Sequence, residues 1–196
     1  MENRISSLSR KTKETNITCT LNIDGSGASN IETGIPFLDH MLISFAKYAK
    51  FDLDIKATGD LEVDYHHEVE DIGLVLGSAF LDALSDGKGI ERFGSFLLPM
   101  DDALVRVVVD ISGRPYLSYN VEFKEERVGN FPVALVVEFM RAFSNQARLT
   151  LHIDALRGEN AHHVIEAMFK SLGKALKIAV SRLGGDEIPS TKGLLI

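Results

Sequence analysis

The sequence has 196 residues with a formal net charge of −7 at pH 7, and hydrophobic residues make up 45% and charged residues 25%. This composition is ordinary for a globular protein of one domain or two small fused halves, and the acidic balance argues against nucleic acid or anionic membrane as a partner. The chain has no apolar run near the ~18 residues that span a bilayer, no apolar signal-peptide core and a single cysteine, so we expect a cytoplasmic protein without disulfides.

The first half of the chain alternates between strand-like and helix-like patterns. Pro36 suits the first position of a helix, and Asp64 suits the cap of another that Gly87 would end. The predicted order is strand, strand, helix, strand and helix, over residues 16–24, 28–35, 36–50, 51–59 and 64–87.

The second half repeats that order, with Asn160 as the cap of its last helix. A repeated order indicates a duplication. We therefore predict an α+β fold of two β-β-α-β-α halves, residues 1–88 and 89–196, each a small sheet with two helices on one face. A hinge is expected at residues 84–95. The second set of elements is expected at residues 103–112, 116–123, 132–147, 148–156 and 160–184.

Two similar polar stretches begin the last helix of each half: DYHHEVEDIG over 64–73 and NAHHVIEAMF over 160–169. Helix positions i and i+4 share a face, whereas neighbouring positions differ by about 100°. Each stretch can therefore offer one imidazole and one carboxylate to a single metal ion, while the second histidines, His67 and His163, must serve other centres. The positive helix N-terminus is expected to keep these rings neutral. The two ligand pairs are His66 with Glu70 and His162 with Glu166.

The other two of the six histidines are His40 and His152. Two sites of three imidazoles and one carboxylate would use every histidine and both glutamates. Such sites suit Mn, Fe, Zn or Co, and the sequence does not choose among them. Asp71, four residues after His67, is expected either to orient that ring or to be an exposed helix acid. The alternative for the histidine pairs is a solvated helix start without metal.

A second group of side chains is suited to binding phosphate. They lie in turn-like or helix-face settings, and the segment IPSTKG (188–193) adds backbone amides. Taken alone, each basic residue is more often a surface charge. The candidates are Arg92, Arg114, Lys170, Ser190 and Lys192.

Several ordered motifs together resemble the imidazoleglycerol-phosphate dehydratase family of histidine biosynthesis over nearly the whole chain. They are TKET (12–15), GIPFLDHML (34–42), the two histidine stretches, GIERFGSFLLPMDDAL (89–104), DISGRPYL (110–117) and IPSTKG. The resemblance implies a duplicated, ribosomal protein S5 domain 2-like fold. It also implies conversion of imidazole-glycerol phosphate to imidazole-acetol phosphate and water, with two Mn²⁺ ions per active site. The assembly would be a homo-oligomeric shell of twenty-four subunits with interfacial sites, and the phosphatase domain of some relatives is not expected here.

The same resemblance implies individual roles. Glu14 would transfer the proton and Asp101 would help to orient the substrate, although a strand acid and a turn acid are their plain alternatives. The expected catalytic residues are Glu14, His40, Asp101 and Glu166. Relatives usually carry Gln at the position of Ser44 and often His at that of Tyr48, so one substrate contact of the family is not expected in its usual form. Every expected metal ligand is present.

Two other functions fit the same residues. A di-metal phosphate-ester hydrolase would use the ions to activate water, although such sites are commonly richer in aspartate. A non-catalytic shell protein linked by metal would not need the basic cluster. Release of free phosphate would favour the hydrolase, and an absence of turnover would favour the scaffold.

Overall fold

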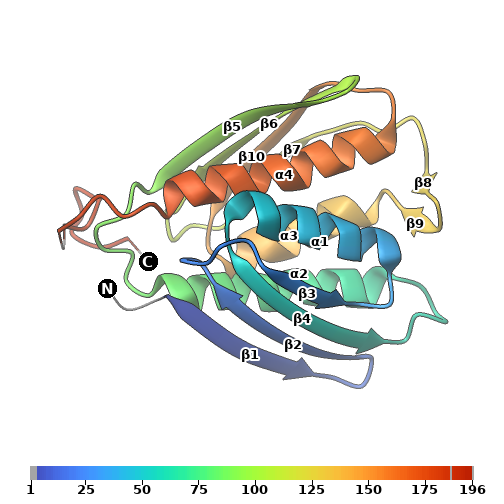
Figure 1. The fold of residues 1–196 in the computed structure, drawn as a ribbon, viewed down its shortest axis with the longest axis horizontal. Helices are drawn as coiled ribbons and strands as arrows, with labels where there is room; N and C mark the ends of the chain where they lie inside the picture. The colour runs from blue at the N-terminus through green and yellow to red at the C-terminus, as the bar shows by residue number, and fades with distance from the viewer. Residues whose placement is uncertain (1–3, 186, 196) are drawn as a thin grey trace.

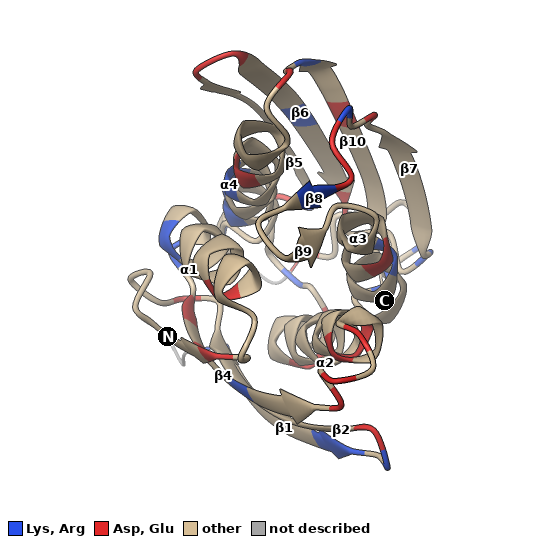
Figure 2. Cartoon of the chain, turned by 90° about the vertical axis from the view of Figure 1, so that its right-hand side faces the viewer, with Lys and Arg blue, Asp and Glu red and all other residues tan. Residues whose placement is uncertain are grey.

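A computed structural model describes residues 4–185 and 187–195. Within these residues, two four-stranded sheets form the outer layers and four helices lie between them (Figure 1). Seen from the end where the helices begin, α4 lies beside α1 and α3 beside α2 (Figure 2). Each sheet therefore buries one face under its own two helices, and the two helix pairs meet in the middle of the molecule.

The first sheet has the order β1-β2-β4-β3, in which β3 runs parallel to β4 and the other neighbours are antiparallel. Buried and exposed side chains alternate along β2 and β4, as a half-buried strand requires. The elements are β1 (Ile5–Lys11), β2 (Thr15–Asn22), β3 (Ser29–Glu32), α1 (Pro36–Ala49), β4 (Asp52–Gly59) and α2 (His66–Leu84).

The second sheet repeats this topology in the order β5-β6-β10-β7, with β7 parallel to β10. A two-stranded ribbon, β8 with β9, is added before its first helix. The predicted α+β class with a repeated order of elements is confirmed. The elements are β5 (Phe93–Met100), β6 (Ala103–Asp110), β7 (Tyr116–Asn120), β8 (Arg127–Val128), β9 (Phe131–Pro132), α3 (Leu135–Gln146), β10 (Thr150–Arg157) and α4 (Ala161–Ala179).

Each half begins with one strand more than the sequence interpretation contained. The edge strand β1 is largely polar, with Ser6 as its buried residue, so it lacks an apolar alternation. The edge strand β5 contains Gly94 and Pro99, which ordinarily weaken a strand assignment. A Cβ atom at Gly94 would collide with the carbonyl oxygen of Ala175 in α4, so the glycine is required by the helix that lies on it.

The two helix pairs are packed in the same way. A Cβ atom at Gly77 of α2 would lie 2.6 Å from the carbonyl oxygen of Phe143, and one at Gly173 of α4 would lie 2.7 Å from that of Phe45. These glycines let α2 approach α3, and α4 approach α1, more closely than any other residue would permit. The rings of Phe45 and Phe143 pack 6.5 Å apart, so the halves share one core.

Candidate active site

Three predicted ligands meet where α1 and α4 begin. The Oε2 atom of Glu166 lies 3.4 Å from Nε2 of His40 and 3.2 Å from Nε2 of His162. The ligand atoms of all three residues lie within 4.8 Å of one another. His162 and Glu166 share a face because they are one helical turn apart, and His40 reaches them from the neighbouring helix. Among the described residues, no other trio of His, Cys, Asp or Glu side chains meets this criterion.

Lys170 holds the carboxylate of this cluster. Its Nζ atom lies 2.8 Å from Oε1 of Glu166, which leaves Oε2 for the histidines. Burial alone would raise the pKa of Glu166, but the hydrogen bond and charge of Lys170, together with His40, lower it overall. Glu166 is therefore ionised at neutral pH, as a metal ligand must be. The structure places Lys170 beside the predicted metal ligands.

The matching stretch on α2 forms only a pair within one chain. Nε2 of His66 lies 3.7 Å from Oε2 of Glu70, and both side chains are nearly half exposed. Asp64 accepts a hydrogen bond from the backbone amide of His66 (2.7 Å), so it satisfies the helix start one position before the cap. In the other repeat, Asn160 caps α4 as predicted, accepting from the amides of His162 and His163.

The second histidine of each pair is held by an aspartate. Nδ1 of His67 lies 3.1 Å from Oδ2 of Asp60, and Nδ1 of His163 lies 2.6 Å from Oδ1 of Asp102. These hydrogen bonds, together with nearby acidic charges, raise the pKa of both histidines. The helix N-terminus, which was expected to favour the neutral form, does not lower the pKa of His67 or His163, because a contacting carboxylate outweighs the helix dipole. In each ring, the other nitrogen, Nε2, points away from the aspartate bonded to Nδ1. Histidines that ligate metals have this arrangement.

Glu14 and Asp101, the acidic residues in the turns before β2 and β6, lie near these histidines. Glu14 and Asp102 hold equivalent places, since each precedes the second strand of its sheet. The charge of Glu14 contributes to the raised pKa of His67, and Oδ2 of Asp101 lies 3.6 Å from Nε2 of His163. Asp101 has a left-handed backbone (φ 46°), a strained conformation that is common at functional sites.

Asp71 does not orient His67. Its carboxylate accepts hydrogen bonds from Arg10 and from Thr15, so it ties α2 to the first two strands. Both proposed alternatives for Asp71 are therefore wrong, since it is buried rather than exposed. Asp60, which sequence reasoning missed, takes the orienting role. It follows directly after β4 and precedes the histidine stretch by a short turn, which is the signal that could have identified it.

Other predicted residues lie at the opposite end of the molecule. Arg92 donates through its backbone amide to Ala179 at the end of α4, whereas His162 stands at the beginning of that helix. Ala179 lies 13 residues beyond Glu166 on α4, which corresponds to about 20 Å at 1.5 Å per residue. Within one chain, Arg92 therefore cannot reach a ligand bound at the His40 cluster.

The residues at this opposite end form their own patch. Arg92 contacts both carboxylate oxygens of Asp110 (2.7 and 3.2 Å) and the carbonyl oxygen of Pro189 (2.8 Å), which anchors the carboxyl-terminal segment. Arg114 is 64% exposed, with Nη2 3.9 Å from Asp110. The exposed ring of His152 lies 5.7 Å from that of Tyr116. Ser190 accepts the amide of Lys192 (3.2 Å) within this segment.

One acidic residue of the first histidine stretch is buried without a partner. Both carboxylate oxygens of Glu68 lack a hydrogen bond among the described residues. Burial, followed by the charges of Asp39 and Asp60, raises the pKa of Glu68 to about 7. Gly59 leaves the space for it, since a Cβ atom there would lie 2.6 Å from Oε2 of Glu68. The sequence interpretation did not single this residue out.

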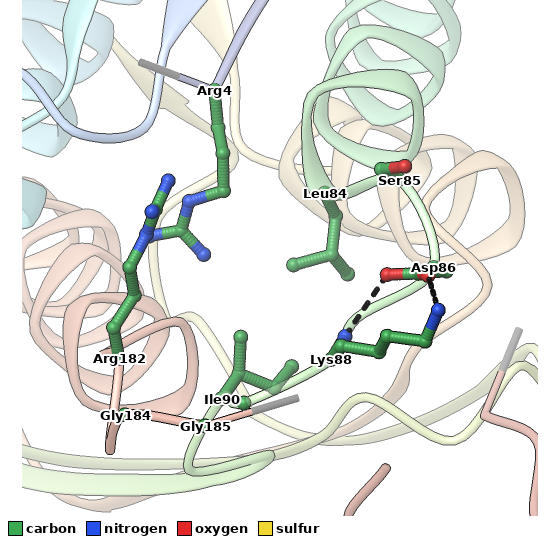
Figure 3. A pocket seen from close by; sticks show the side chains of 10 residues that line it. Arg4, Leu84, Ser85, Asp86, Lys88, Ile90, Arg182, Gly184 and Gly185 are labelled. Carbon is green, nitrogen blue, oxygen red and sulfur yellow. Dashed lines mark hydrogen bonds and ion pairs between the residues drawn. The ribbon is translucent and has the colours of Figure 1, made fainter. Parts of the chain in front are cut away.

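A cavity of about 440 Å³ lies away from the histidines, between the linker after α2 and the segment after α4 (Figure 3). Its basic side chains contact acids. Arg4 and Arg182 lie 2.6 and 3.0 Å from the carboxylate of Asp24, and Lys88 lies 2.7 Å from that of Asp86. The hydrogen bond from Arg4 lowers the pKa of Asp24 to about 2. This network joins the first strand to the end of the last helix.

The fold and the site define a duplicated α+β protein whose helix starts gather imidazole and carboxylate groups. Residues 33–176 match the family model of imidazoleglycerol-phosphate dehydratase. Imidazoleglycerol-phosphate dehydratase of Caldanaerobacter subterraneus is 57% identical over 195 residues, which cover 98% of this chain and 100% of the relative. The chain belongs to the imidazoleglycerol-phosphate dehydratase family and is therefore a lyase of histidine biosynthesis.

Solved structures agree with this assignment. The crystal structure of the enzyme from Staphylococcus aureus superposes with a TM-score of 0.83 at 45% identity, covering 91% of this chain and 99% of that one. The enzyme from Pyrococcus furiosus, solved in complex with (S)-C348, gives a TM-score of 0.84 at 43% identity and coverages of 96% and 100%. Among the described residues, none of the helices is long and apolar enough to cross a membrane.

Proposed function

We propose that this dehydratase depends on divalent metal, with Mn²⁺ as the preferred ion, and that His40, His162 and Glu166 hold one of two ions. The observation that carries this proposal is the convergence of two imidazoles and one carboxylate from α1 and α4. Ligand atoms that are each ~2.1 Å from one ion are about 3 to 3.5 Å from one another. The separations of 3.2 and 3.4 Å from Glu166 Oε2 to the two rings match that spacing.

The second ion would be held by His66 and Glu70 together with histidines that these residues do not contact in the same chain. His67 and His163 face away from the ligand pairs, and His152 lies on the outer face of the second sheet. We propose that neighbouring subunits complete both ligand sets, in a large homo-oligomer of a cytoplasmic enzyme. The separation of the Arg92 patch from the His40 cluster supports the same proposal, because the Arg92 patch and the ring-binding groups of one site would then come from different chains.

When bound, the metal would act as a Lewis acid and as a template for the imidazole ring and a hydroxyl of the substrate. The chain's own residues would supply orientation and proton transfer. Lys170 keeps Glu166 ionised and turned toward the histidines, and the aspartates fix His67 and His163. Glu14 would carry the proton removed from the substrate carbon. Arg92, Arg114, Ser190 and Lys192 would position the phosphate, which is the entropic part of catalysis.

The experiment is an ultraviolet assay for the ketone product on protein stripped of metal with a chelator and then supplied with Mn²⁺. We expect activity to disappear and return, with about two ions per chain in the active form. Free phosphate instead of ketone would show a hydrolase. Full activity in verified metal-free protein would contradict the proposal.

A further inference from the structure

A stripe of polar residues continues along α4 beyond the ligand cluster. His162, Glu166, Lys170 and Lys174 are spaced four residues apart, so each lies beside the next in a row that winds slowly around the helix. On the neighbouring α1, His40 and Tyr48 are two turns apart. The line of contact between α1 and α4, called the α1–α4 seam, therefore carries ligand groups where the helices begin. Farther along, it carries two lysines and an aromatic ring.

Lys170 and Lys174 meet over one aromatic ring. The Nζ atoms of Lys170 and Lys174 lie 5.2 and 5.7 Å from the ring centroid of Tyr48, and that of Lys174 lies 5.8 Å from the ring of Phe96. Glu166 neutralises Lys170, but Lys174 has no carboxylate within ion-pair distance among the described residues. Aromatic faces hold a cation only weakly, so the seam retains one positive charge that an anion would complement.

Packing does not require these two lysines. The α2–α3 seam has the same backbone approach, at Gly77 as at Gly173. At the places equivalent to Lys170 and Lys174, it carries Leu74 and Ser78. There the hydroxyl of Ser78 donates to Gln146 (3.3 Å), the counterpart of Tyr48. The repeat without a three-ligand cluster thus dispenses with both cations.

We infer that Lys174, oriented by the ring of Tyr48, binds the phosphate group of the substrate. This inference rests on the proposed function of the His40 cluster. The substrate carries an imidazole ring and a phosphate dianion at the two ends of a three-carbon chain. Lys174 is two helical turns beyond Glu166, about 12 Å along the axis, and helical side chains lean back toward the helix start. Between His40 and Tyr48 on α1 stands Ser44, a small residue whose side chain is buried.

The test compares Lys174→Met with Lys47→Met, which removes an equal charge from the exposed side of α1. We expect Lys174→Met to raise KM roughly tenfold or more, the loss of one charge-assisted hydrogen bond. Its kcat and metal content should stay near those of the wild type, and inorganic phosphate should compete correspondingly less well. Lys174→Arg should restore most of the affinity. An unchanged KM in Lys174→Met, or an equal rise in Lys47→Met, would overturn the inference.

Tyr48 is a positioning residue and is tested through its ring. Tyr48→Phe should keep KM within about twofold, because the ring face is retained, whereas Tyr48→Leu should raise it and lower the salt dependence of KM. Equal effects of the two substitutions would contradict steering by the ring. Calorimetry of inorganic phosphate binding to each variant tests the role of Lys174 separately from turnover. Turnover that is independent of metal would contradict the proposed function, but it would leave this test of Lys174 unaffected.

Discussion

The two helix seams share a backbone and differ in chemistry. In both, a glycine allows the last helix of one half to lie against the first helix of the other, with Phe45 and Phe143 in matching places. Along α1–α4, a histidine, a buried glutamate and two lysines follow in order. Along α2–α3, Glu138 stands in the place of His40 and Leu74 in that of Lys170. Duplication thus preserved the close packing that both halves need, while the three-residue cluster of His40, His162 and Glu166 and the two lysines occur along one seam only.

The largest expected effect concerns the three-ligand cluster. Glu166→Gln removes its oxygen ligand, so we expect activity to fall roughly a hundredfold or more, since even the loss of groups that only orient metal ligands costs 10–100-fold. Metal analysis should show about one ion fewer per chain. Glu70→Gln should also lose an ion, but from the site that we propose neighbouring chains complete.

An unchanged metal content in both variants would remove the basis for treating the seams as metal-binding elements. Glu138→Gln is the matched control. It changes the counterpart of His40 on α3 without touching a proposed ligand, and both metal content and activity should stay near the wild-type values.

The shared packing predicts equal effects in the two seams. Gly77→Ala and Gly173→Ala each place a methyl group within 2.7 Å of a backbone carbonyl oxygen, so each should lower the free energy of unfolding by about 1–3 kcal/mol. Urea denaturation measures this in the metal-free protein. If only one substitution destabilises the protein, the seams are not equivalent in packing.

Lys170 should contribute to stability as well as to the site. Lys170→Met leaves the buried carboxylate of Glu166 without its closest cation, and we expect a loss of roughly 1 to 2 kcal/mol in metal-free protein at pH 7. Leu74→Met, the matched change on α2, conserves volume and should stay well below that cost. Equal values for the two variants would show that the ion pair adds nothing to folding.

The smallest expected effect is on the titration of the second histidine in each repeat. In metal-free protein, the ring resonances of His67 and His163 should titrate above the ordinary pKa of 6.5, because Asp60 and Asp102 stabilise their charged forms. Each pair therefore stabilises the fold below pH 6.5, and this contribution is lost as pH rises through the raised pKa. In NMR titrations, Asp102→Asn should lower the pKa of His163 and leave that of His67 in place. A joint shift of both resonances would show that the two aspartates do not act locally.

Much of this arrangement follows from the sequence because it depends on local spacing. The i, i+4 relation placed His162 and Glu166 together. Asn160 was predicted correctly as the cap of α4, and Asp64 located the start of α2 to within one residue of its cap, Tyr65. The strands β1 and β5 were not predicted from the sequence, because Ser6 and Gly94 occupy buried positions where an apolar residue would normally indicate a strand. The helix predicted from Pro132 begins at Leu135, since Phe131–Pro132 pairs with Arg127–Val128 in the β8–β9 ribbon.

Contacts between residues that are far apart in the sequence could not be predicted from residue spacing. No pattern in the chain shows that His40 meets Glu166 while His152 lies with Arg114 at the other end of the molecule. Side-chain partners were equally inaccessible. Asp60 rather than Asp71 holds His67, because that contact depends on how the turn after β4 returns toward α2. The contact between Lys170 and Glu166, by contrast, follows from their i, i+4 spacing on α4.

The network around Asp24 has a consequence for the order of the halves along the gene. Arg4 at the start of the first strand bonds the carbonyl oxygen of Val180 just after α4 (3.0 Å), so the beginning of the first half adjoins the end of the last helix (Figure 1). Each repeat has its own complete sheet. A circularly permuted chain that runs from Lys88 through the second half, a flexible linker and the first half should therefore keep both seams. Cooperative unfolding with an unchanged far-ultraviolet spectrum would show that either half can come first, whereas a permutant without a cooperative transition would show that the native connection after α2 is needed.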